Sequence, residues 1–122
     1  MNIGVPKETH PQEERIALIP PSVERLVRLG AHVTVEAGLG TAINLSDEEY
    51  KKAGAAIQSE LRGLLSSSDL ILRLRKPPLE EIPSFKKGSL HISFLDPFNE
   101  RALIEELARH HISAISMEMI PR

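Results

Sequence analysis

The sequence predicts an α/β fold in which helices cover both faces of an open, mostly parallel sheet. Short apolar segments alternate with helix-like patterns along the whole chain, and the connections between them are short. Residues 69–74 form an aliphatic run, as expected of a strand that is buried on both faces. Repeated strand–helix–strand units of this kind build a doubly wound, three-layer sheet of the flavodoxin or Rossmann type.

The strand candidates have apolar residues at alternate positions or in one continuous run, and they span residues 2–5, 32–36, 69–74, 90–95 and 112–117. The helix candidates span residues 20–30, 46–54 and 59–65, with a further helix starting at Asn99. Pro20 and Pro21 favour a helix start, and Gly30 is a typical stop. Ser46 and Glu49 have the spacing of a capping box. Residues 7–15 and 79–88 are predicted to be irregular connections.

The Gly-x-Gly of residues 37–40 is predicted to be a plain turn. The dinucleotide fingerprint needs a third glycine and a helix directly after it, and here the next helix starts only at Ser46. The sheet is therefore expected to lack a phosphate cradle of its own.

Composition excludes several classes of protein and site. The formal net charge is −2 and the basic residues are spread along the chain, which argues against nucleic-acid binding. The absence of cysteine excludes disulfides, thiolate metal sites and cysteine nucleophiles. The five histidines lack metal-ligand spacing. We see no apolar run of the roughly 20 residues that cross a bilayer and no signal peptide, so we expect a cytoplasmic protein without direct membrane insertion.

Candidate ligand-binding residues follow the strands, because ligands of open parallel sheets bind beyond the carboxyl ends of the strands. Arg15, in the loop after the first strand, could hold a carboxylate or phosphate, or it could be a solvated surface arginine. Arg73 and Arg75 alternate along the strand of residues 69–74 and its end, so they are predicted to share a face and form an anion site. The alternative is that they pair with Glu80 and Glu81.

Asp96 follows the strand of residues 90–95 and is a further candidate. Its alternative role is to cap the helix expected near Asn99.

Several segments together resemble the alanine dehydrogenase/pyridine nucleotide transhydrogenase family, namely residues 3–8, 14–20, 33–38, 53–55 and 69–77. The resemblance implies that residues 1–122 form the single N-terminal, non-nucleotide-binding domain of a two-domain enzyme. The NAD-binding Rossmann domain of that enzyme would be absent from this chain. Because a doubly wound unit would continue with a helix after its last strand, we expect the chain to be cut at Arg122.

The resemblance also separates two branches of this family. In alanine dehydrogenases an arginine equivalent to Arg15 and a lysine at the position of Arg75 bind the substrate carboxylate, and a histidine stands at the position of Asp96. The two replacements argue against alanine oxidation. Residues 114–122 are similar to a transhydrogenase segment, which implies that Arg122 contacts the nicotinamide of NAD(H). Glu118 sits where both branches carry an acidic residue, and it could instead close the strand end.

The function implied is that of the N-terminal domain of an NAD(P) transhydrogenase alpha subunit. Hydride would pass between NAD(H) and NADP(H), coupled to proton translocation in the full complex. The expected partners are the NAD-binding domain of the same polypeptide and the NADP-binding and membrane subunits, with the subunit a homodimer at the cytoplasmic face of the inner membrane. The alternatives are an alanine dehydrogenase-type amino-acid dehydrogenase and a free-standing, non-catalytic binding domain. The isolated chain is expected to be inactive and to bind no NAD(H).

Overall fold

A computed structural model describes residues 1–119 of the chain. Its strands are β1 (Asn2–Val5), β2 (His32–Glu36), β3 (Ala56–Gln58), β4 (Leu70–Arg75), β5 (Leu90–Phe94) and β6 (Ser113–Ser116). They form one six-stranded sheet in the order β3-β2-β1-β4-β5-β6, and every neighbouring pair is parallel. The open, doubly wound parallel sheet expected from the sequence is confirmed.

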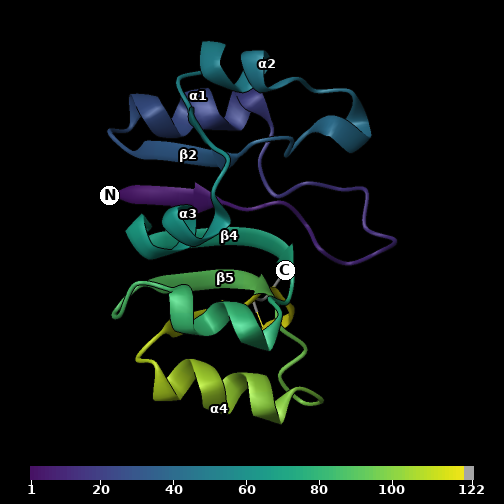
Figure 1. Cartoon of the computed structure of the whole chain (residues 1–122), viewed down its shortest axis with the longest axis vertical. Helices are drawn as coiled ribbons and strands as arrows, with labels where there is room; N and C mark the ends of the chain where they lie inside the picture. Colours follow the sequence, from purple (N-terminus) through teal and green to yellow (C-terminus); the bar gives the residue numbers. More distant parts are fainter. Residues whose placement is uncertain (120–122) are drawn as a thin grey trace.

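The helices are α1 (Pro20–Arg28), α2 (Asp47–Lys52), α3 (Leu61–Ser67) and α4 (Arg101–Arg109), with 3-10 helices η1 (Thr41–Ile43), η2 (Leu79–Ser84) and η3 (Met117–Met119). The chain builds one half of the sheet from β1 outward to β3, then returns past β1 and builds the other half from β4 to β6 (Figure 1). Because parallel crossovers are right-handed, the two halves carry their helices on opposite faces of the sheet.

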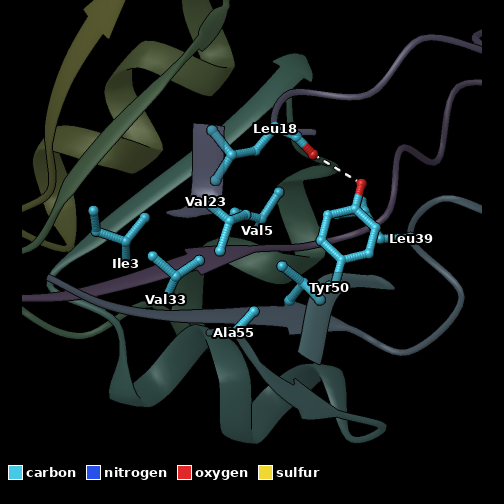
Figure 2. Close-up of a cluster of buried hydrophobic side chains, with 9 residues drawn as sticks. Ile3, Val5, Leu18, Val23, Val33, Leu39, Tyr50 and Ala55 are labelled. Carbon is cyan, nitrogen blue, oxygen red and sulfur yellow. Dashed lines mark hydrogen bonds between the residues drawn. The ribbon is translucent and has the colours of Figure 1, made fainter. Parts of the chain in front are cut away.

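Two separate apolar cores correspond to these two faces. The first lies under α1 and α2 and is built from Ile3, Val5, Leu18, Val23, Val33, Val35, Leu39, Tyr50 and Ala55. Figure 2 shows Tyr50 closing this core, with its hydroxyl donating a hydrogen bond of 2.8 Å to the carbonyl oxygen of Leu18. The second core lies under α3, η2 and α4 and is built from Leu64, Leu65, Ile71, Ile82, Phe85, Leu95, Leu103, Leu107 and Ile112.

Local capping signals predicted two of the helices well. Pro20 and Pro21 occupy the first turn of α1, where a missing N–H costs nothing, and Gly30 beyond its end has a φ of +98°. The Ser46 hydroxyl accepts from the backbone N–H of Glu49, and the Glu49 carboxylate accepts from the backbone N–H of Ser46. The capping box at the start of α2 is therefore confirmed.

Other elements differ from the sequence-based prediction. The prediction missed β3, since this three-residue edge strand is too short to show an apolar alternation. α3 and α4 begin at Leu61 and Arg101, two residues later than expected at each start, and β6 is shorter. The irregular connection of residues 79–88 contains η2, whose Ile82 enters the second core. Within residues 1–119, no helix has the length and apolar character needed to span a bilayer.

A polar cluster lies buried between β5 and the second core. The imidazole of His91 is 0% exposed, stacks on Phe85 with ring centroids 5.4 Å apart, and lies 3.0 Å from the Ser93 hydroxyl through Nε2. Burial, with a further contribution from the positive charge of Arg73, lowers the pKa of His91 from 6.5 to about 3. The ring is therefore neutral in the folded chain at pH 7.

His91 should make the chain less stable as the pH falls. Between pH 6.5 and 3 the unfolded chain takes up a proton at this ring and the folded chain does not, so the free energy of unfolding decreases as the pH drops through this range. Urea unfolding at pH 7 and pH 5 should show this loss, and His91→Gln should remove most of it. An equal loss in His91→Gln would mean that other groups cause the acid sensitivity.

The opposite face of β4, β5 and β6 is apolar and partly open. Leu72, Ile92 and Ile115 lie in one row across the three strands, and Phe94 follows on β5. Phe94 and Ile115 are 37% and 40% exposed, and α1 and α2 lie over β2 and β3 instead. We call these four residues the open apolar face.

Candidate functional site

The candidate site lies at the carboxyl ends of β1 and β4, where the strand order reverses. Ligands of doubly wound sheets bind at this topological switch point. The connection from β1 to α1, residues 6–19, is long and irregular, and it supplies Arg15 to this edge.

Backbone and side-chain contacts hold this connection against β2 and β4. The Glu36 carboxylate accepts from the Lys7 backbone N–H at 2.7 Å. The Glu8 carboxylate accepts from the backbone N–H groups of Leu74 and Arg75, both at 2.8 Å, and so replaces a strand partner where β4 ends. The loop is therefore built into the sheet edge, although it has no regular secondary structure.

Glu13 joins the two arginine candidates. Its side chain is 4% exposed, and one carboxylate oxygen accepts from Arg15 Nη2 and Arg75 Nε, both at 2.9 Å. The other oxygen accepts from Arg15 Nε at 2.9 Å and from the Arg15 backbone N–H at 3.0 Å. Arg15 and Arg75, which are 60 residues apart in the sequence, thus share a single carboxylate.

These bonds fix the charge of Glu13. Hydrogen bonds from the side chain and backbone of Arg15, with a smaller contribution from Arg75, lower the pKa of Glu13 from 4.5 to about 2. The same ion pair raises the pKa of Arg15. Glu13 therefore stays ionised across the physiological pH range, and the nearby Glu8 carboxylate adds to the negative charge that faces Arg15.

Two pockets flank the Glu13 cluster. One, of about 390 Å³, lies beside Arg15 and Glu13 and is also lined by Lys7, Gly38 and Thr41. The other, of about 360 Å³, contains three of the candidates predicted from the sequence, Arg75, Asp96 and Glu118, together with His10, Lys76, Pro77 and Phe94. We call the second one the Arg75 pocket.

Asp96 and Glu118 are linked at the ends of β5 and β6. The Glu118 carboxylate accepts from the Asp96 backbone N–H at 3.0 Å and from the Ser116 hydroxyl. Desolvation raises the pKa of Glu118, but these hydrogen bonds and two from other backbone N–H groups outweigh it and lower the pKa below the ordinary value. Glu118 therefore forms hydrogen bonds at the ends of β5 and β6, which is the alternative role considered for it in the sequence.

Asp96 does not cap α4, since Glu100 stands at that N-cap and the helix starts at Arg101. The Asp96 carboxylate instead accepts from the Asn99 side-chain amide at 3.0 Å, and the residue has a φ of +52°.

The prediction that Arg73 and Arg75 share a face is wrong. The β4–β5 register shifts between Leu72 and Arg75, so one extra residue on β4 reverses the alternation of side chains. Arg73 is buried and pairs with Glu81 at 2.7 Å, as one alternative anticipated for this residue, whereas Arg75 turns to Glu13. Arg122, which the resemblance places against the nicotinamide of NAD(H), lies outside the described residues.

The residues present do not fit a dinucleotide cradle. α1 starts with two prolines, which have no N–H to offer a phosphate, and it starts far along the chain from the end of β1. The Gly38 N–H of the Gly-x-Gly turn is already donated to the Asp47 carboxylate at 2.9 Å. Among residues 1–119 no group of acidic, histidine or cysteine side chains could hold a metal ion.

Glu8 and Glu13 were not identified as site residues from the sequence. Both are acidic residues in a polar loop, and nothing in their spacing distinguishes them from Glu14, which is exposed. Glu8 and Glu13 find their hydrogen-bond partners, Leu74 and Arg75, only because the end of β4 lies against the loop in the folded chain.

Comparison with known proteins gives one family. The family described as alanine dehydrogenase/PNT, N-terminal domain, matches residues 4–122. An NAD(P) transhydrogenase alpha-subunit protein of Rhodospirillum rubrum is 34% identical over the whole chain, which covers 33% of that protein. Alanine dehydrogenase of Methanococcus maripaludis is 33% identical over 98% of the chain, which covers 32% of that protein. The solved transhydrogenase from Sinorhizobium meliloti superposes with a TM-score of 0.94 at 34% identity, and the match covers the whole chain and 36% of that structure.

The chain therefore spans about a third of the length of these relatives. Both kinds of relative are oxidoreductases, and the transhydrogenases act on NAD(P), as their name states.

Proposed function

Since this chain belongs to the alanine dehydrogenase/PNT N-terminal domain family, we propose that it is the N-terminal domain of an NAD(P) transhydrogenase alpha subunit. The observation that carries the choice of branch is Asp96. The alanine dehydrogenase branch has a histidine at this position, whereas here the side chain is a carboxylate that accepts a hydrogen bond from Asn99, so the imidazole of that branch is missing. The similarity to the Rhodospirillum and Sinorhizobium transhydrogenases over the whole chain supports the same choice.

In this role the chain would not carry the hydride itself. Its residues would form one side of the hydride-transfer site. The loop of residues 7–15, held by its hydrogen bonds to β2 and β4, and the Arg75 pocket would lie at the edge of the sheet. Such a surface helps to hold two nicotinamides in a reactive geometry and to keep water away. NAD(H) would be bound by a second domain, and NADP(H) by another subunit, in a dimeric complex coupled to proton translocation at the cytoplasmic face of a membrane.

The open apolar face supports the proposal that further polypeptide belongs to this domain. An apolar surface of this kind, formed by Leu72, Ile92, Phe94 and Ile115 across β4, β5 and β6 of a parallel sheet, is normally covered. Reading the gene beyond codon 122 tests this aspect of the proposal. A continuing frame that encodes a strand followed by Gly-x-Gly-x-x-Gly would support it, and an immediate stop codon would favour the free-standing binding domain.

One observation favours the second candidate, an alanine dehydrogenase-type enzyme. Arg15 and Arg75, whose counterparts in that branch bind a substrate carboxylate, lie on the same carboxylate of Glu13. The identity to the Methanococcus alanine dehydrogenase is also close to that of the transhydrogenases. Oxidation of NADH that depends on pyruvate would distinguish this candidate.

We expect the isolated chain to show no saturable affinity for NADH. In the part of the chain that the structure describes, the prolines at α1 and the occupied Gly38 N–H leave no cradle for the pyrophosphate. Isothermal titration of the chain with NADH up to about 1 mM should give only heats of dilution, which corresponds to less than about 4 kcal/mol of binding free energy. A saturable signal in the micromolar range would show that this domain holds the cofactor itself.

A further inference from the structure

We propose that Arg73 is a positioning residue of the candidate site. Through its ion pair with Glu81 it fixes the backbone of Lys7, and thereby the path of the loop of residues 7–15. Neither the family match nor the relatives' names assign a role to this buried pair. The inference deepens the proposed function, and it rests on that function only for the effect on turnover.

Stability alone does not account for a charged pair at this place. The side chain of Arg73 is 1% exposed, that of Glu81 is 11% exposed, and Nη1 donates to the Glu81 carboxylate at 2.7 Å. Removing two such charges from water costs much of what their attraction returns, so apolar residues of similar volume are often as stable or more stable. We therefore looked for a contact that leucines at these two positions could not make.

The second donor of Arg73 makes such a contact with the loop. Nη2 donates to the Lys7 carbonyl oxygen at 3.3 Å. On the other side, the Lys7 backbone N–H donates to the Glu36 carboxylate at 2.7 Å. Glu36 ends β2 and Arg73 lies in β4, and these are the two strands that flank β1. Side chains from both neighbouring strands therefore hold the two polar groups of the Lys7 backbone where the loop leaves the sheet.

The position of Lys7 affects the rest of the site. The next residue, Glu8, accepts from two backbone N–H groups at the end of β4, and the loop then continues to Glu13 and Arg15. Lys7 and Arg15 also line the same pocket of about 390 Å³ beside the turn at Gly38. A shift of the Lys7 backbone would therefore move the start of the loop together with the side chains that line this pocket.

An arginine suits both contacts because its guanidinium is a planar fork with donors on separate nitrogens. The register shift in β4 turns Arg73 toward η2, where Glu81 lies. Glu81 is itself held in place, since the neighbouring Ile82 is fully buried in the second core. The pair thus sets the plane of the guanidinium, and Nη2 is aimed at the Lys7 carbonyl oxygen.

The test variant replaces both Arg73 and Glu81 with leucine, so that no unpaired charge remains in the interior. It is made in the complete gene product that contains this chain, and backbone hydrogen exchange is followed by mass spectrometry. We expect the segment with Lys7 to exchange about 10-fold faster, the effect of losing one hydrogen bond from a charged donor. Exchange in α1, which packs on the first core, should not change.

Turnover separates positioning from a general structural role. The variant should lower kcat about 10- to 100-fold, as expected when a small misplacement disturbs the reactive geometry, and leave the KM for NAD(H) within about 3-fold, because a second domain would bind the cofactor. The reaction followed is hydride transfer from NADPH or, if the unaltered protein performs it instead, pyruvate-dependent oxidation of NADH. The control variant, Arg101→Gln with Glu105→Gln, removes an exposed ion pair and should change neither exchange nor kcat.

Two results would overturn the proposal. Unchanged exchange at Lys7 would mean that Arg73 does not hold the loop. Faster exchange with an unchanged kcat, or with a higher KM alone, would mean that the position of the loop does not serve the reaction. If the double-leucine variant does not fold, Arg73→Lys replaces it, since one ammonium can keep the pair with Glu81 but lacks the second arm of the fork, and the same outcomes apply.

The two arms of the experiment also separate this inference from the proposed function. An unaltered protein that performs neither reaction would contradict the proposed function. Hydrogen exchange needs no turnover, so it would still decide whether Arg73 fixes the loop.

Discussion

Replacing Glu81 with Ala is expected to lower the free energy of unfolding by about 3–5 kcal/mol. The reason is that Arg73, whose side chain is 1% exposed, would keep its charge in the interior without its partner at 2.7 Å. A loss of this size is a large part of the total stability of a small domain, which is about 5–15 kcal/mol. Urea unfolding followed by circular dichroism measures it.

Two controls accompany this prediction. Glu105→Ala removes a carboxylate from an exposed pair with Arg101 and should cost about 0.5 kcal/mol or less. Replacing both Arg73 and Glu81 with leucine should recover most of the loss, since no buried charge remains. A cost below about 1 kcal/mol for Glu81→Ala would contradict the buried ion pair.

Tyr50→Ala is expected to cost about 3–5 kcal/mol, because it empties a fully buried aromatic site in the first core. The same change removes the hydrogen bond from the Tyr50 hydroxyl to the carbonyl oxygen of Leu18 (Figure 2). Leu18 lies near the end of the loop that carries the candidate site. Tyr50→Phe should cost about 1–3 kcal/mol, since the Leu18 carbonyl loses its partner while the packing stays. If the two variants were equally stable, the ring would contribute little packing.

The sequence was most informative where structure depends on neighbouring residues. The capping box at Ser46 and the proline start of α1 each involve a few consecutive residues, and both were predicted correctly. Apolar residues at alternate positions, or in one continuous run for β4, also predicted five of the six strands, because these patterns reflect burial directly. β3 is a short edge strand whose side chains are exposed or only half-buried, so its sequence shows no apolar pattern.

The site was less predictable because it depends on contacts between distant segments. The extra residue in β4 is defined only by its pairing with β5, and it sends Arg73 and Arg75 to different partners. Glu13 gained its role from the meeting of the loop with the end of β4. The sequence could place Arg15 and Arg75 at the correct edge of the sheet, but it could not show that one carboxylate joins them.

Hydride transfer by the complete gene product is the most direct test of the central claim. The complete gene product that contains this chain is combined with an NADP-binding transhydrogenase subunit, and reduction of an NAD analogue by NADPH is followed with and without pyruvate. We predict transfer from NADPH to the analogue that does not require pyruvate. Oxidation of NADH that requires pyruvate and ammonia, without any transfer between the two nucleotides, would contradict the account and identify an alanine dehydrogenase.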